Sequence, residues 1–171
     1  MIISILNCDK NFGIGKKNGL LFNLPLDMKY FKEKTSGHTV AMGENTLLSF
    51  PGQKPLKNRE NIVLSKDKDH NYDGVINVHS FDEFLKIIKK KSLEDDVFII
   101  GGASIYKQTL PYVDVVLLTK VDADGHAEVF FPNIDENQDF NCVDNGEPIM
   151  DGKYKIRFTT YINNNKKVIE L

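Results

Sequence analysis

The sequence predicts an α/β fold in which residues 1–171 form a single domain around a mostly parallel, twisted mixed sheet of about eight strands with helices on both faces. Apolar runs of strand length alternate along the chain with segments of helical periodicity, the order typical of such sheets. The run Val97–Ile100 is apolar without interruption, as expected of a central strand covered on both faces. With 171 residues, 41% of them hydrophobic, the chain suffices for one core and leaves little room for a second.

The N-terminal segment predicts a strand, a long loop and a helix. Residues 2–8, Ile-Ile-Ser-Ile-Leu-Asn-Cys, form the expected buried first strand. Residues 9–23 hold three glycines and few periodic apolar positions, so we expect a loop, and loops of this length in compact domains are often functional. Pro25 suits the first position of a helix, which we expect to run to about Thr35.

The next segment predicts three short strands and one short helix. Thr39–Met42 reads as a strand, and a helix follows over about Glu44–Phe50, where Pro51-Gly52 ends it. Two further apolar runs, Ile62–Ser65 and Val75–Val78, have the length and the β-branched residues of buried strands.

The C-terminal half continues the alternation. Ser80 and Glu83 form a capping box, and the apolar residues behind it recur with helical spacing. Gly101-Gly102 directly follows the central strand and precedes a helix that we expect to end at Leu110, before a proline. The remaining strands are expected at Val115–Thr119, near Phe140–Asp144 and at Lys155–Asn163, the last two pairing antiparallel.

Charge and cysteine content exclude several classes of protein. The net charge of -2 and pI near 6.1, with no basic stripe, argue against a nucleic-acid partner. Cys8 and Cys142 lie far apart without a CxxC pair and histidine is scarce, so no structural metal site is expected, and a disulfide is neither required nor excluded. The first strand starts beside Met1 without a basic leader, and no apolar run reaches membrane-spanning length, so we expect a cytoplasmic protein with no membrane partner.

Asp27 lies on the apolar side of the helix that begins at Pro25, three residues after Leu24 and four before Phe31. A carboxylate on such a face is costly unless it is hydrogen-bonded or paired. Two interpretations remain open. The acid can cap the first helical turn, where a negative charge suits the dipole. Alternatively, it lines an apolar pocket, where desolvation tunes its pKa and it binds a protonatable heterocycle.

Three junctions between strand and helix or loop suggest an anion site. Gly101-Gly102 lies between a strand and the start of a helix, so the glycines would let an anion approach the free N–H groups of the helix. Glycines that are present only for close packing would explain the pair equally well. The GxGxxG pattern of dinucleotide-binding folds is absent. Met42-Gly43 repeats the arrangement, and Ser65-Lys66 ends another strand with a hydroxyl and a cation. Together the three junctions fit a ligand with several phosphates, such as a dinucleotide. Considered alone, Lys66 is explained more simply as a solvated surface residue.

Four motifs resemble, in order and spacing, the signatures of the dihydrofolate reductase family across nearly the whole chain. None of them is decisive alone, but their ordered coincidence is highly specific. They are Gly13-Ile14-Gly15 with the segment from Leu21 to Phe31, Met42-Gly43 with Thr46, the segment from Pro55 to Ser65, and Ile100-Gly101-Gly102 with Ile105-Tyr106; Leu118-Thr119 and Phe131-Pro132 also fit.

The resemblance implies reduction of 7,8-dihydrofolate to 5,6,7,8-tetrahydrofolate, a step of one-carbon metabolism. Asp27 would be the sole ionisable residue facing the pterin and would bind its amidine edge, with Thr119 hydrogen-bonded to it and Phe22 beside the proton path. Arg59 would pair in bidentate fashion with the α-carboxylate of the glutamate tail. The implied apolar lining of the substrate pocket is Ile5, Leu6, Met28, Phe31, Phe50, Leu56 and Ile100.

NADPH is the cofactor that the resemblance implies. Asn7 and Ile14 occupy the positions that touch the nicotinamide carboxamide, and the Gly101-Gly102 peptide is expected to be cis. The loop at 9–23 would close over the nicotinamide and exclude water, and the proton would arrive through water. The other implied cofactor-binding residues are Gly43, Asn45, Thr46, Leu64, Ser65, Lys66, Gly101, Gly102, Ala103, Ser104, Ile105 and Tyr106.

The chain departs from the family pattern at several site positions. Phe22 stands where tryptophan is usual, and a phenyl ring cannot hold the water that an indole N–H holds, so proton delivery is expected to differ. Asn7 replaces a small apolar residue, which is expected to change the nicotinamide contacts. Glu44 stands where a basic residue often meets the 2′-phosphate and should repel it, while Ser65 and Lys66 could compensate; Ser104 likewise replaces a residue that is often basic or polar.

Two rival functions are considered. A reductase of the same fold acting on a riboflavin-pathway pyrimidine would need no clamp for a glutamate tail, so Arg59 together with Asp27 argues against it. A nucleotide-binding module without catalysis would gain nothing from Asp27 on an apolar face.

Antifolates of the diaminopyrimidine type are expected to pair with Asp27, with altered sensitivity because of Phe22, Asn7 and Phe50. We expect a monomer, as in most of the family.

Overall fold

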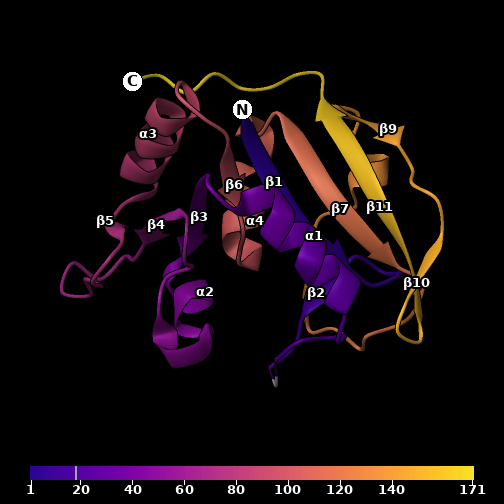
Figure 1. The fold of residues 1–171 in the computed structure, drawn as a ribbon. Coiled ribbons are helices and arrows are strands. Elements are labelled where there is room, and N and C mark those ends of the chain that lie inside the picture. Colours follow the sequence, from indigo (N-terminus) through magenta and orange to yellow (C-terminus); the bar gives the residue numbers. More distant parts are fainter. Residues whose placement is uncertain (18) are drawn as a thin grey trace.

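The computed structural model describes residues 1–17 and 19–171 and places β1 (Ile2–Cys8) in the middle of the sheet. Parallel strands flank it on both sides, β6 (Val97–Ile99) on one and β7 (Val115–Val121) on the other (Figure 1). Beyond β6 the parallel part continues through β3 (Thr39–Gly43), β4 (Glu60–Leu64) and β5 (Ile76–Val78).

The other edge of the sheet is antiparallel, so the predicted mixed sheet is confirmed. The long strand β11 (Tyr154–Asn163) pairs antiparallel with β7 and carries β10 (Ile149–Asp151) on its far side. The strand β9 (Phe140–Asp144) also pairs with β11, outside the main order β10-β11-β7-β1-β6-β3-β4-β5.

Alternating residues of the central strands divide the core into two layers, because successive side chains of a strand point to opposite faces. Ile2 belongs to the layer covered by α3 (Phe81–Ser92) and α4 (Ala103–Thr109). Ile3 belongs to the layer covered by α1 (Pro25–Thr35) and α2 (Glu44–Leu48). Helices therefore cover both faces of the sheet, as predicted, and the two layers hold the following pairs of neighbours: Ala41 and Val40, Ile62 and Val63, Ile99 and Phe98.

The helix ends agree with the sequence-based expectation in some places and differ in others. The predicted Ser80 cap is present, with its hydroxyl accepting a hydrogen bond from the Glu83 N–H at 3.1 Å. The helix expected over Glu44–Phe50 ends at Leu48 and is followed by a 3₁₀ turn at Pro51–Gln53. The remaining 3₁₀ turns are Leu110–Tyr112, which takes over where α4 ends, and Ile134–Glu136.

Three short strands lie in segments that were expected to be loops, and one of them, β10, forms a hairpin with β11. The strand β2 (Gly13–Gly15) lies inside the predicted loop 9–23 and pairs antiparallel with β8 (Val129–Phe130). Such short strands exist only through this long-range pairing, which local sequence patterns do not encode. Among the described residues, no helix combines the length and the apolar character needed to cross a membrane.

Candidate active site

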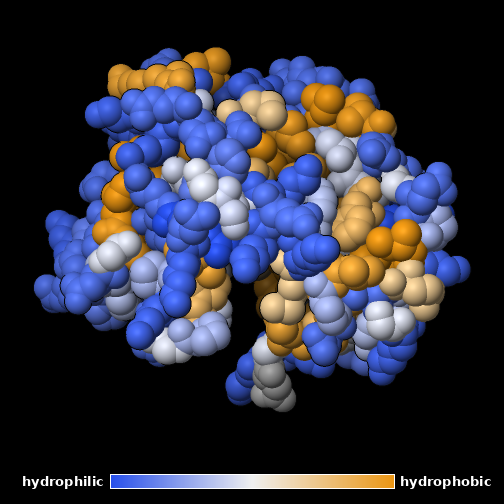
Figure 2. All heavy atoms as spheres, viewed as in Figure 1, coloured by the Kyte–Doolittle hydropathy of each residue, from blue (hydrophilic) through white to orange (hydrophobic). Residues whose placement is uncertain are grey.

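A cleft of about 810 Å³ opens at the carboxyl ends of β1 and β6, where ligands bind in sheets of this kind. It lies between α1 and α2 and is bordered by the loop after β2. In Figure 2 the surface is hollowed at this edge, with hydrophobic residues visible in its depth. The apolar and aromatic lining includes Ile5, Leu6, Ile14, Leu20, Leu21, Phe22, Met28, Phe31, Leu56, Ile100, Tyr106 and Val129.

Asp27 is the buried acid of this cleft, with 9% of its surface exposed. Thr119 on β7 donates a hydrogen bond of 2.6 Å to Oδ1, and the Asn7 amide on β1 donates one of 2.9 Å to Oδ2. Asn7 and Thr119 are direct partners in the β1–β7 register, so the sheet itself brings the two donors to one carboxyl. Both oxygens are therefore held in fixed directions.

The pKa of Asp27 lies above its ordinary value, and burial is the main cause because it disfavours the charged form. The hydrogen bonds from Thr119 and Asn7 act in the opposite direction, since both stabilise the carboxylate. The negative charge of Asp151 raises the pKa further. An acid with these properties can exchange a proton, or bind a cationic heterocycle, under conditions where an exposed carboxyl stays ionised.

Gly43 at the end of β3 and Gly101 after β6 bring two backbones together beside the cleft. The Gly43 N–H donates to the Gly101 carbonyl at 2.9 Å, and the Gly101-Gly102 peptide is cis, as the resemblance implied. A Cβ on Gly43 would lie 3.1 Å from Ile105, and one on Gly101, where φ is +128°, would lie 3.2 Å from Thr46 Oγ1. Side chains at either position would fill this cradle.

This cradle suits the phosphates of a dinucleotide. The helix α4 begins at Ala103, and its N-cap residue Gly102 supplies no side chain to cap the first turn. A helix start with bare N–H groups and an approachable backbone favours negative charge. The cleft runs from this point past Thr46 to Asn7 and Ile14, so one extended ligand could contact all of them.

Glu44, the first residue of α2, is hydrogen-bonded to several neighbours. Tyr72 donates a hydrogen bond of 2.6 Å to Oε2, and His70 Nδ1 lies 2.8 Å from the same oxygen. Hydrogen bonds from Tyr72, Ser65 and His70 lower the pKa of Glu44, although partial burial opposes them. Glu44 is thus an acid that its neighbours hold in the ionised form.

The loop over the cleft is fastened by two acids that sequence reasoning did not single out. Glu128 accepts a hydrogen bond of 2.7 Å from the Lys17 N–H, and its own N–H donates to the Gly15 carbonyl at 2.9 Å. Asp9 is buried and accepts from the N–H groups of Gly13 and Gly125 at 2.7 and 3.1 Å. No local pattern marks Glu128, because its partners lie in a distant segment, whereas Asp9 accepts both from the nearby Gly13 N–H and from the distant Gly125 N–H.

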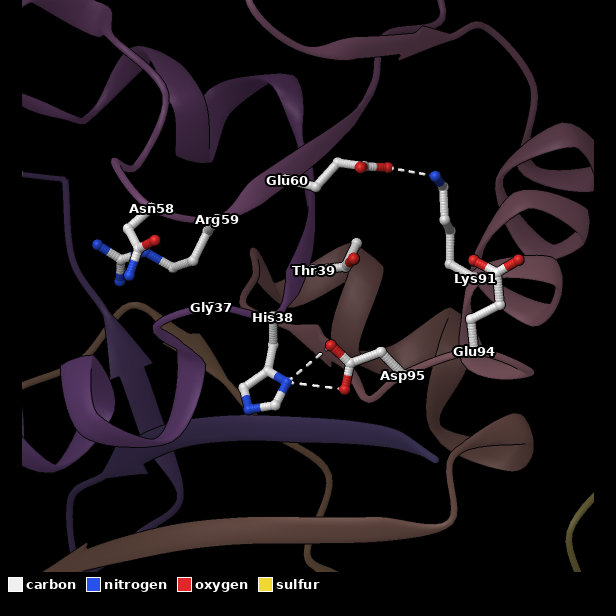
Figure 3. A pocket seen from close by; sticks show the side chains of 9 residues that line it. All are labelled: Gly37, His38, Thr39, Asn58, Arg59, Glu60, Lys91, Glu94 and Asp95. Atoms are coloured by element: carbon white, nitrogen blue, oxygen red, sulfur yellow. Dashed lines mark hydrogen bonds and ion pairs between the residues drawn. The ribbon is translucent and has the colours of Figure 1, made fainter.

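Arg59 reaches the mouth of the cleft beside α1. Its Nη1 donates to Thr35 Oγ1 at 3.0 Å, and its Nε donates to the Lys57 carbonyl at 2.9 Å. Arg59 also borders a smaller polar pocket of about 370 Å³, where Figure 3 shows its side chain pointing away from the His38–Asp95 and Lys91–Glu60 pairs. The remaining N–H groups of the guanidinium are available to a carboxylate in the larger cleft.

The predicted site residues divide into three groups. Most of them border the cleft, and among these Met28 is 62% exposed at its rim. Thr119 lies beneath Asp27 and acts on the cleft through it. The predicted residues that do not border this cavity are Phe50, Gly43, Asn45, Leu64, Ser65, Lys66, Ser104 and Ile105.

Phe22 lies at the edge of the cleft and packs edge-on against Tyr154, with ring centroids 4.7 Å apart. Its ring offers no hydrogen-bond donor, at a position where the family usually has an indole N–H.

Both cysteines, Cys8 and Cys142, are free thiols.

Comparison with known proteins identifies close relatives of this arrangement. A family model described as dihydrofolate reductase matches residues 1–164. The dihydrofolate reductase of Bacillus subtilis is 36% identical over 167 residues, covering 96% of each chain, and that of Staphylococcus haemolyticus is 34% identical over 128 residues, covering 75% of this chain and 74% of the relative. Among solved structures, dihydrofolate reductase from Enterococcus faecalis complexed with NADP(H) and RAB-propyl superposes with a TM-score of 0.86 and 32% identity, covering 96% of each chain.

Proposed function

This chain belongs to the dihydrofolate reductase family and is an NADPH-dependent oxidoreductase that reduces 7,8-dihydrofolate to 5,6,7,8-tetrahydrofolate, and we propose that Asp27 is the residue that recognises the pterin and favours its protonated form. The observation that carries this proposal is a buried carboxyl, held by Asn7 and Thr119, in a cleft that is otherwise largely apolar. Such an acid gains most from a ligand that offers paired N–H donors.

Asp27 would bind the amidine edge of the pterin through its two oxygens, while Ile5, Phe31 and Ile100 pack against the ring. Thr119 and Asn7 hold the carboxyl in the orientation that this contact requires. Because burial raises the pKa of Asp27, the acid retains or shares a proton at a pH where an exposed acid would have lost it. We propose that the proton reaches the pterin through water, with Phe22 shaping that path without donating to it.

The glycine cradle supports the placement of NADPH in the same cleft. Gly43, Gly101-Gly102, Thr46 and the start of α4 would hold the diphosphate, and Ile14 would contact the nicotinamide. When bound, the reduced nicotinamide supplies the hydride. The loop of Gly15 and Leu20 borders the cleft and would exclude water from it.

Arg59 would bind the glutamate tail of the substrate. Its position at the mouth of the cleft, beside Leu56 and Phe31, fits a substrate whose ring lies at Asp27 and whose carboxylate reaches the surface. The Thr35 and Lys57 contacts fix the guanidinium plane, which a bidentate carboxylate contact needs.

We also propose that residues 1–171 act as one domain and as a monomer, as the resemblance to the family implies. The free thiols Cys8 and Cys142 fit a reducing compartment and support a cytoplasmic location. Antifolates of the diaminopyrimidine type would pair with Asp27 in the same way as the pterin. Asn7 and Phe22 beside that acid would make their affinity for this chain differ from that for relatives with the usual residues.

NADPH oxidation with dihydrofolate, measured for the purified protein and for Asp27→Asn, tests this proposal. We expect the wild type to turn over and the variant to lose most activity at neutral pH, by about 100-fold or more. Calorimetry should show that Asp27→Asn still binds NADPH. A variant that keeps wild-type turnover would contradict the role of Asp27, and cofactor binding that is indifferent to folates would favour the nucleotide-binding module.

A further inference from the structure

Asp151 is a buried acid at the end of β10, with 1% of its surface exposed. The two-residue turn between β10 and β11 begins at Gly152, whose φ of +61° is a conformation that glycine adopts without strain. This edge hairpin brings the Asp151 carboxylate beside the first turn of α1, 125 residues away from Leu26 in the sequence.

Asp151 satisfies the N–H groups that the start of α1 leaves open. Pro25 has no N–H, and the Met28 N–H already donates to a backbone carbonyl at 2.9 Å. The Leu26 N–H donates to Oδ1 of Asp151 at 3.0 Å, and the Asp27 N–H donates to Oδ2 at 3.0 Å. The residue at the N-cap, by contrast, supplies no side-chain hydrogen bond. A distant strand therefore caps this helix.

The cap also places a second negative charge close to Asp27. Both oxygens of Asp151 accept hydrogen bonds, as a carboxylate does, and the positive end of a helix dipole stabilises that charge. Of the influences on the pKa of Asp27, burial is the largest, the bonds from Thr119 and Asn7 oppose it, and the charge of Asp151 adds to it.

The other titratable groups around Asp27 do not carry a negative charge like that of Asp151. Tyr30 on α1 and Tyr106 on α4 both have a raised pKa, mainly through burial and further through the charge of Asp27, so they stay neutral. Lys29, Lys32 and Arg59 line the cleft as cations. Among the described residues, Asp151 is thus the carboxylate that acts on Asp27.

We propose that Asp151 is a positioning residue for the reduction, because it fixes the backbone N–H of Asp27 and holds a negative charge beside the Asp27 carboxyl. This inference rests on the proposed role of Asp27. Its consequence is that the catalytic acid retains its proton to a higher pH than it would with a neutral cap. An acidic cap on this helix therefore serves the site as well as the fold.

The test compares Asp151→Asn with a structural control, Asp114→Asn. Asp114 also accepts a backbone hydrogen bond, from the Ile2 N–H at 2.8 Å, but lies at the opposite end of the sheet. Both variants should lower the melting temperature by about 2–4 °C, as the loss of one capping interaction does. The Asp27 carboxyl is then titrated in the ligand-free proteins by ¹³C NMR, and turnover is measured across pH.

For Asp151→Asn we expect the Asp27 titration to move to lower pH, the turnover profile to move with it, and turnover at neutral pH to fall by about three- to tenfold. Asp151→Ser, which is also neutral, should move both in the same direction and serves if the asparagine variant folds poorly. A fall in melting temperature with an Asp27 titration that stays in place, as in Asp114→Asn, overturns the proposal. A wild-type profile in Asp27→Asn would instead overturn the proposed role of Asp27.

Discussion

The side-chain amide of Asn7 donates a hydrogen bond of 2.9 Å to Oδ2 of Asp27. This contact arises because β1 carries Asn7 opposite Thr119 of β7, so that both side chains meet the same carboxyl. A donor of this kind stabilises the ionised acid and lowers its pKa. Asn7 is thus part of the environment of the acid, in addition to lining the cleft.

Replacing Asn7 by Ala is expected to raise the pKa of Asp27 further, because burial then acts with one opposing hydrogen bond fewer. The pH profile of turnover should move to higher pH, in the direction opposite to that expected for Asp151→Asn. Steady-state rates across pH, with Asn7→Ser as a variant that keeps a smaller polar group, measure this. A profile that moves to lower pH would show that Asn7 does not stabilise the carboxylate.

Glu44 is expected to weaken binding of the 2′-phosphate of NADPH. Substitution Glu44→Arg should tighten NADPH by about tenfold, since a repelling charge becomes an attracting one, and should change NADH by much less. Calorimetric titration with both cofactors measures the difference. Tyr72→Phe, which removes the 2.6 Å hydrogen bond and keeps the charge, is the control. If the affinities for NADPH and NADH move together, Glu44 does not face the phosphate.

Much of the fold could be predicted because its signals are local. The central strand Val97–Ile99 is continuously apolar, Ser80 caps its helix through its own hydroxyl, and Pro25 starts α1. Likewise, Gly101 stands at a strand-to-helix junction with a φ of +128°, a conformation that favours glycine. In these cases one short segment contains both the residue and its physical cause.

The features that could not be predicted depend on residues far apart in the sequence. The strand β2 exists because Gly13 pairs with Phe130, and Asp151 caps a helix that begins more than a hundred residues before it. Met28, which was expected to line the pocket, borders the cleft and is 62% exposed, because the cleft leaves that position of the helix open. Helical spacing predicts which face of a helix is apolar. Which residues of that face are buried depends on where the cleft opens, and the spacing does not show this.

Arg59→Lys is expected to raise the KM for dihydrofolate by about tenfold or more while kcat and the Kd for NADPH change little. A lysine carries the charge but cannot form the planar, bidentate contact with a carboxylate, and it loses the contact with the Lys57 carbonyl that orients the group. Lys57→Ala, at an exposed neighbour, is the matched control. An equal loss in kcat and in NADPH affinity would place Arg59 outside the tail-binding site.

Removing the side chain of Glu128 is expected to loosen the loop over the cleft. Glu128→Ala deletes the acceptor for the Lys17 N–H, so closure is weakened and NADPH should dissociate severalfold faster in stopped-flow measurements. The melting temperature should change little, because the contact lies at the surface. Glu147→Ala removes another exposed acid and should leave the dissociation rate unchanged. Equal rates in the two variants would mean that the clamp does not hold the loop.

The burial of Asp27 also predicts a pH dependence of stability. Because burial raises its pKa in the folded protein, the folded state binds the proton more tightly than the unfolded chain does. Stability therefore falls as the pH rises from the ordinary pKa of the acid through its folded value, and the full cost of the buried charge is present above that window. Asp27→Asn removes the titration, so the variant should be more stable than the wild type above the window, by about 1 kcal/mol.

Urea unfolding of both proteins over a series of pH values measures this difference. The advantage of Asp27→Asn should shrink as the pH is lowered, since the wild-type acid is then neutral as well. For Asp114→Asn the pH dependence of stability should have the opposite sign. Hydrogen bonds from the Ile2 N–H and Lys166 hold the pKa of Asp114 below its ordinary value despite its partial burial. That carboxylate adds stability above its ordinary pKa and loses it as the pH falls. A difference between wild type and Asp27→Asn that is constant with pH would mean that the pKa of Asp27 is the same in the folded and unfolded states.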